Sequence, residues 1–218
     1  MNSYKKYFLR AIKNHYPTQV NELMVSLEEH YKVISKDTHF AATSSNPIDK
    51  RLDFCACFLA LIKTLDERGE SFETIRKVCL EVVLDYVKPK NKLSAWAKRI
   101  PAKLIQFPFS TFLIKIFNEK VSKKGNEDGF LAHIITDKSE TYGLGYGIDI
   151  IECGICKLFK KHNFQKYASI LCEVDEVTSG LAGLKLIRRV FTELCQYLIF
   201  KFINLNSVTK CNQQFRQN

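Results

Sequence analysis

The sequence predicts an α+β fold, in which a helical N-terminal half packs on a C-terminal ββααββ unit with a small antiparallel sheet. Two observations predict this fold. Apolar residues recur at every third or fourth position from residue 3 to about residue 122, which is the period of a helix. From Phe130 onward, short apolar runs bounded by glycines and polar turns replace that period, as in strands. Strands that are grouped together after a run of helices favour an antiparallel sheet.

The first two helices are expected at residues 3–16 and from Pro17 to Ile34, where proline is tolerated at the helix start. Each carries an apolar stripe on one face. Residues 36–46 are polar and have no period, so we expect a loop of about ten residues there. The sequence does not reveal whether this loop has a role at a site.

Four more helices are expected in the N-terminal half. One begins near Pro47 and runs to Glu67, and because it is apolar on most faces we expect it to lie at the centre. Ser71 is placed as the N-cap of the next helix. The last two are expected at residues 91–106 and 109–122, separated by a Phe-Pro pair.

The C-terminal half contains the predicted sheet. Its elements in order are two strands, two short helices and two further strands, expected at residues 130–137, 144–153, 155–162, 164–174, 184–193 and 197–204. We therefore divide the chain into a helical region (1–125), a sheet region that carries the candidate site (126–206) and a polar tail (207–218), and expect one compact domain.

The chain has a formal net charge of +10 at pH 7. This excess makes an anionic partner, such as a membrane surface, a nucleic acid or a small carboxylate, a candidate, but a lysine-rich surface that has no partner is the simpler interpretation. The lysines form no dense run, and no RNA-binding pattern of basic and aromatic residues in strand register occurs, so nucleic acid is not expected. The oligomeric state is not indicated.

Eight cysteines are present, and the first sixteen residues are charged and amphipathic, unlike a signal peptide. No apolar run approaches the length of a transmembrane segment. We therefore expect a reduced, cytoplasmic protein whose cysteines act mainly as small buried hydrophobic residues. Cys153 and Cys156 form a C-x-x-C motif, but no second ligand pair and no βαβ frame surround it, so neither a zinc site nor a redox site is predicted. No cofactor is identified.

Three short motifs follow one another in the C-terminal half. The apolar run IIEC ends at Cys153, LCEVD contains Cys172 and Asp175, and RVFT contains Arg189 and Thr192. With the segments ALIKTL and GESFETIRKV of the helical half, they resemble the L-2-amino-thiazoline-4-carboxylic acid hydrolase family of bacterial proteins over roughly two thirds of the chain. One difference stands out, because a Cys-Asp pair that this family carries on its last strand is replaced here by Phe200 and Lys201.

The resemblance implies an enzyme that opens a cyclic thiazoline by hydrolysis to a carbamoyl-cysteine, a hydrolase acting on a non-peptide carbon–nitrogen bond. Because the Cys-Asp pair is missing, an alternative is a catalytically inactive small-ligand-binding or sensor domain on the same scaffold. A third alternative is a basic interaction protein with an acidic partner.

Ring hydrolysis requires a base or a nucleophile, a donor for developing charge and a cation for the substrate carboxylate. Asp175 is the candidate base, and Cys153 and Cys172 are candidate nucleophiles or metal ligands. Arg189 is the candidate clamp for the substrate carboxylate, because guanidinium can bind it with two hydrogen bonds. Thr192 and His133 complete the candidate substrate-binding residues.

Each of these residues also has a purely structural interpretation. Cys172 would be a buried thiol on an apolar helix face, and Cys153 a packing residue at a strand-to-helix junction. Asp175 would cap a helix, with Thr178 three residues later. His133 would be a satisfied core histidine, and Arg189 a surface residue. Cysteine, aspartate and histidine can bind zinc, but their spacing matches no established motif, so no metal site is predicted.

Overall fold

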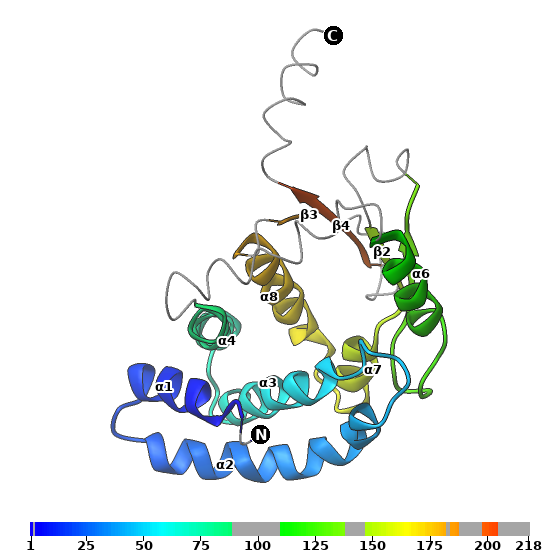
Figure 1. The fold of residues 1–218 in the computed structure, drawn as a ribbon. Helices are drawn as coiled ribbons and strands as arrows, with labels where there is room; N and C mark the ends of the chain where they lie inside the picture. The colour runs from blue at the N-terminus through cyan, green and yellow to red at the C-terminus, as the bar shows by residue number, and fades with distance from the viewer. Residues whose placement is uncertain (2, 89–109, 138–146, 182–183, 188–197, 205–218) are drawn as a thin grey trace, which may run out of the picture. The chain divides into compact units, whose positions relative to one another are not determined.

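In this computed structural model the described residues of the first half of the chain form helices, and those of the second half form an antiparallel sheet and further helices (Figure 1). The α+β prediction is therefore confirmed. The described residues are 1, 3–88, 110–137, 147–181, 184–187 and 198–204. The chain divides into two compact units, the first made of residues 1–88, 124–130 and 154–174, and the second of residues 89–123, 131–153 and 175–218.

Helix α3 (Arg51–Asp66) is the centre of the first unit. From Cys55 to Leu65 every residue except Lys63 is buried, which confirms the central position predicted from its apolar faces. Its neighbours include α2, which lies along it, the 3-10 helix η1 (Ser35–Ala42), α4 and α7 (Figure 1). The remaining elements of this unit are α1 (Lys5–His15), α2 (Val20–Ile34), α4 (Phe72–Val87), α7 (Gly154–Lys161), the 3-10 helix η2 (Gln165–Tyr167) and the first part of α8 (Ala168–Leu181).

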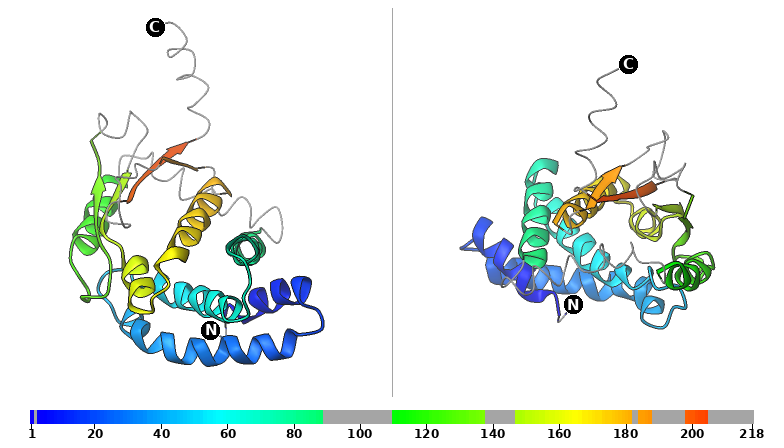
Figure 2. Two further views of the ribbon diagram at one scale, coloured as in Figure 1. Left: turned by 180° about the vertical axis from the view of Figure 1, so that it is seen from behind. Right: turned by 45° about the horizontal axis from the view of Figure 1, so that its top comes forward.

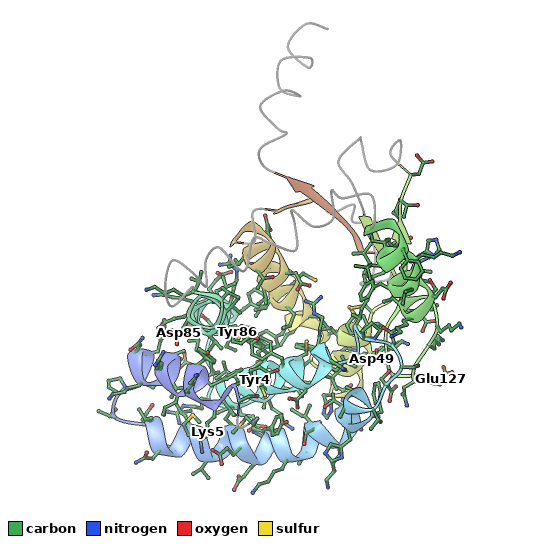
Figure 3. The ribbon with its side chains drawn as sticks, viewed as in Figure 1. Tyr4, Lys5, Asp49, Asp85, Tyr86 and Glu127 are labelled. Carbon is green, nitrogen blue, oxygen red and sulfur yellow. The ribbon has the colours of Figure 1, made fainter. Side chains whose placement is uncertain are left out.

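Aromatic side chains join α1, α3 and α4. The ring of Phe54 lies 4.6 Å from that of Tyr4, 4.8 Å from that of Phe58 and 5.0 Å from that of Tyr86, measured between centroids. Tyr4 and Tyr86 are labelled in Figure 3. Rings at these separations add to the stability that their burial provides. The predicted N-cap of α4 is confirmed, because the Ser71 hydroxyl accepts the backbone N–H of Thr74 at 3.1 Å.

Residues 35–42 differ from the prediction. They continue α2 as the 3-10 helix η1 (Ser35–Ala42) and do not form the irregular loop expected from their polarity. Only Thr38 and Ala41 of this segment are buried, and η1 packs on α3. Two small side chains three positions apart follow the three-residue period of a 3-10 turn, which a search for the α-helical period does not detect.

A buried polar network joins the segment before α3 to the turn at residues 125–130. The Asp49 carboxylate (Figure 3) accepts the Phe130 backbone N–H at 2.7 Å and the Ser44 hydroxyl at 2.5 Å. The Asn46 amide donates to the Phe130 carbonyl at 2.9 Å, and its oxygen accepts the Ile48 N–H at 3.1 Å. Asp49 and Asn46 are fully buried. The network therefore satisfies polar groups that burial would otherwise leave without partners.

The second unit contains a four-stranded antiparallel sheet with the strand order β1-β2-β4-β3. Its strands are β1 (Leu131–Ile135), β2 (Gly147–Glu152), β3 (Leu184–Ile187) and β4 (Leu198–Asn204), each within a predicted strand. Helix α6 (Ser110–Val121) packs beside the edge strand β1 (Figure 2). The Asn118 side chain accepts the Ile134 backbone N–H at 2.7 Å, so this donor of the sheet edge is satisfied.

Several expectations fall on residues outside the described ranges. These are the helix at 91–106, the connection at 138–143 and the tail at 207–218. The division at residue 125 into regions of one compact domain stays a prediction. Within the described ranges, no helix is both long and apolar enough to cross a membrane.

Candidate functional site

Cys153 lies between the last residue of β2 and the first residue of α7, at the strand-to-helix junction that the sequence predicts. Its exposed fraction is 7%. A thiolate gains stability near a helix N-terminus, where backbone N–H groups are unsatisfied. The ring of Phe130 packs closely against the backbone of the next residue, Gly154. A Cβ atom on residue 154 would lie only 3.1 Å from this ring.

Cys172 and Asp175 lie three residues apart on α8 and therefore share one face of this helix. Their exposed fractions are 8% and 7%. Asp175 is inside the helix, which continues to Leu181, so the interpretation of Asp175 as a helix cap is wrong. The Thr178 hydroxyl donates to the Asp175 backbone carbonyl at 3.0 Å, the opposite of a capping bond. The structure thus presents a thiol and a carboxyl group together on one buried helix face.

His133 is exposed on β1, so its interpretation as a core histidine is wrong. The Ser122 hydroxyl lies 3.4 Å from its Nδ1. Asp149 of β2 is directly opposite His133 in the strand register. Side chains of directly opposite residues lie on the same face of a sheet. Sequence reasoning gave Asp149 no role, because the pairing of two strands is not visible in either strand alone.

Arg189 and Thr192 lie outside the described residues. For the last strand, the structure gives the backbone register of β4, in which Phe200 pairs with Ile148 and Lys201 with Gly147 of β2. The positions that carry the sequence difference from the hydrolase family are therefore the strand neighbours of β2, which ends one residue before Cys153.

None of the described cysteines is part of a disulfide. Burial, assisted by the nearby Asp53 carboxylate, raises the pKa of the Cys57 thiol to about 12. Burial alone raises the pKa of Cys79. Both thiols are therefore neutral near pH 7 and suited to packing. Among the residues that the structure describes, no group of three or more histidine, cysteine or acidic side chains is arranged to hold a metal ion.

A second cluster, unnoticed in the sequence, surrounds the C-terminal end of α7. The Asp37 carboxylate of η1 binds the Lys161 ammonium group at 2.9 Å and His162 Nε2 at 3.0 Å. Lys161 also binds Asp128 at 3.3 Å, and the Lys157 ammonium group donates to the Glu127 and Gly129 carbonyls at 2.6 and 3.1 Å. A small pocket in this cluster is lined by Asp37, Thr38, Leu52, Asp128, Lys157, Leu158 and Lys161.

These contacts join η1 to the C-terminal end of α7. Partial burial alone would raise the pKa of Asp37, but the hydrogen bonds and charges of Lys161 and His162 outweigh it, so the pKa of Asp37 is lowered. The carboxylate form is therefore the one that holds η1 on α7. Because the charged groups around the pocket bind one another, we interpret the cluster as structural. No sequence signal could reveal it, since Asp37 and His162 are 125 positions apart.

Comparison with known proteins gives one match. The sequence model of a family described as L-2-amino-thiazoline-4-carboxylic acid hydrolase matches residues 50–189, which is well over half of the chain. Cys153, Cys172, Asp175 and His133 lie inside the matched region, and Arg189 is its last residue. Neither the comparison with curated proteins nor the comparison with solved structures gave a match.

Proposed function

Because the chain belongs to the L-2-amino-thiazoline-4-carboxylic acid hydrolase family, we propose that it is a hydrolase of small cyclic C–N substrates of this thiazoline type. The observation that carries the proposal is the family match, which spans the buried Cys172 and Asp175 of α8 and the buried Cys153 at the β2–α7 junction. We also propose a cytoplasmic location, because no described cysteine forms a disulfide and thiols stay reduced in that compartment.

The reacting atom of such a substrate is the ring carbon bonded to sulfur, to the ring nitrogen and to the exocyclic amino group. Water adds its oxygen to this carbon while the C=N bond becomes a single bond. The water proton passes through the base to the nitrogen, and a tetrahedral intermediate with a hydroxyl group forms. This hydroxyl then becomes the product carbonyl as the bond from the carbon to the ring sulfur or ring nitrogen breaks, and its proton passes to the leaving atom. The product is a carbamoyl-cysteine. The chain must therefore supply a base, a donor to the leaving atom and a cation for the substrate carboxylate.

Asp175 is the proposed base. An ionised carboxylate on a buried helix face interacts with a bound water more strongly than an exposed one, since the surroundings screen the interaction less. Cys172, on the same face of α8, is proposed to contact the ring or to donate to the leaving atom. Cys153 is proposed as the alternative nucleophile, because its thiolate would gain from the N-terminus of α7.

Arg189 is the proposed clamp for the substrate carboxylate, with Thr192 and His133 as further binding residues. The net charge of +10 supports an anionic substrate, because a positive surface attracts it. The exposure of His133 is compatible with contact to a substrate that arrives from solvent.

The test is ring opening of L-2-amino-thiazoline-4-carboxylate by the purified full-length chain, followed by mass spectrometry for the addition of water. A thiol reagent distinguishes the two cleavages, since C–S cleavage releases a free thiol and C–N cleavage does not. We expect Asp175→Asn to lower kcat/KM by about 10²–10⁴, the usual contribution of a general base. Cys79→Ala, which alters a buried thiol of α4, is the control and should retain the wild-type kcat/KM. The proposal is wrong if the wild type leaves the ring intact, or if Cys153→Ala, Cys172→Ala and Asp175→Asn all match its rate.

The proposed binding of the substrate carboxylate by Arg189 is tested separately, with a substrate that lacks the carboxylate. Arg189→Met should raise KM for the carboxylated thiazoline and leave the rate with 2-amino-2-thiazoline unchanged. An equal effect on both substrates would exclude carboxylate binding by Arg189.

A further inference from the structure

Helix α6 carries a cluster of large apolar side chains on its outer surface. The exposed fractions are 67% for Phe112, 58% for Leu113, 37% for Ile116 and 41% for Phe117. Leu113, Ile116 and Phe117 follow Phe112 by one, four and five positions, so the four side chains are neighbours over two turns of the helix. The patch consists of these four residues and is called the α6 patch below.

The other side of α6 is already used. Asn118 lies on the face opposite the α6 patch and binds the Ile134 backbone N–H of β1 at 2.7 Å. Val121, the last residue of the helix, is fully buried. The helix is therefore fixed to the sheet by one face and presents the α6 patch to solvent. Exposed apolar side chains elsewhere in the described residues, such as Val25 and Val33 of α2, are not adjacent in this way and need no partner.

The charges around the α6 patch are positive. Lys115 lies within its span, Lys120 is in the last turn of the helix and Lys123 follows two residues after its end, all in exposed positions. Glu119 is the one acidic residue of α6. In the sequence, no acidic residue occurs between Asp85 and Glu119, whereas that interval contains seven lysines and arginines: Lys88, Lys90, Lys92, Lys98, Arg99, Lys103 and Lys115.

We propose that the α6 patch is a peripheral docking surface for an anionic lipid bilayer. Aromatic and aliphatic side chains on one helix face, accompanied by lysines, are what the boundary between headgroups and acyl chains accommodates. Phe112 and Leu113 enter that boundary furthest, because they are the most exposed, and the lysines bind lipid phosphates. A second copy of the chain is disfavoured as the occupant, since it would bring two positive surfaces together.

The experiment is flotation of the full-length chain with lipid vesicles. We expect binding to phosphatidylcholine vesicles that contain phosphatidylglycerol, weaker binding to phosphatidylcholine alone, and release at high salt, which screens the lysines. The double variant Phe112→Ser, Leu113→Ser should bind at least about tenfold more weakly, because it removes the two most exposed apolar side chains. The control variant Val25→Ser, Val33→Ser removes two apolar side chains of α2 whose exposed fractions, 58% and 57%, are similar, and it should bind like the wild type.

Two measurements separate lipid binding from misfolding of the variant and from dimerisation. Hydrogen exchange of the wild-type chain should slow across residues 112–117 when anionic vesicles are added, which tests the surface even if the double variant does not fold. Light scattering reports the oligomeric state. Equal binding to both vesicle types, equal binding by the double variant and its control, or a dimer that the double variant dissociates would each overturn the proposal.

Discussion

Replacing Asp49 with alanine should destabilise the protein substantially. Its carboxylate is fully buried and accepts the Phe130 N–H at 2.7 Å and the Ser44 hydroxyl at 2.5 Å. Hydrogen bonds to a charged group contribute about 1.5–3 kcal/mol each, so two of them contribute about 3–6 kcal/mol. Alanine also removes a buried charge and thereby recovers part of its desolvation penalty. We expect a net loss of about 2–4 kcal/mol in the free energy of unfolding, measured by urea denaturation followed by circular dichroism.

A double-mutant cycle with Gly129 tests whether this carboxylate also determines the shape of the turn at residues 125–130. A Cβ atom at Gly129 would lie 2.7 and 2.8 Å from the two carboxylate oxygens of Asp49, closer than van der Waals contact. Gly129→Ala should therefore cost about 1–3 kcal/mol in the wild type, as overpacking does. In the Asp49→Ala background the obstacle is absent, so the cost should fall by at least about 1 kcal/mol.

Gly69 provides the matched control for this cycle. Its φ is +77°, and a Cβ atom there would meet nothing within 4 Å. Gly69→Ala should therefore cost about 1–2 kcal/mol through backbone strain alone, by the same amount with or without Asp49. If Gly129→Ala cost as much in the Asp49→Ala background as in the wild type, the steric reasoning would be refuted. A loss below about 1 kcal/mol for Asp49→Ala would refute the hydrogen-bond estimate.

Two further predictions concern other contacts. Because Lys161 and His162 lower the pKa of Asp37, its carboxylate stabilises the fold at neutral pH and loses this effect as the pH falls through its folded-state pKa, below the usual value near 4. Thermal unfolding of Asp37→Asn should therefore show a lower Tm than the wild type at pH 7, and the difference in Tm should narrow as the pH falls below about 4; a difference that stays constant down to about pH 2 would contradict this. Asn118→Ala should cost about 1–2 kcal/mol, since the Ile134 N–H loses its acceptor at the sheet edge; urea midpoints equal to those of the wild type would contradict it.

The helices were predictable because their signal is local. The apolar stripes of α1 and α2, the apolar faces of α3 and the Ser71 cap of α4 are all contained in neighbouring residues. The prediction failed where the determinant is remote or weak. The polar residues of η1 have no α-helical period, so the sequence predicts a loop in place of this 3-10 helix. Helix α8 continues seven residues beyond the expected end at Val174. Gly180, which the sequence predicts to begin a loop, lies inside α8. A glycine lowers helix propensity by about 1 kcal/mol, which does not by itself end a helix.

The candidate site was predictable in part for the same reason. Once α8 is accepted, the three-residue spacing alone places Cys172 and Asp175 on one face. The role of Asp175 as a cap was excluded only by the observed length of the helix. The pairing of His133 with Asp149 depends on the register of β1 and β2, which the composition of a single strand does not determine.

The family match begins at residue 50, yet the first unit depends on residues that precede it. Asp49 and Asn46 bind Phe130 in the turn at 125–130, and Ser44 binds Asp49. Asp37 binds the end of α7. The turn and α7 both lie inside the matched region. Buried side chains of α1 and α2 belong to the same core as the central α3. The region that identifies the family therefore does not coincide with a folding unit. Helices α1 and α2 and the segment that follows them are part of the scaffold that supports α7.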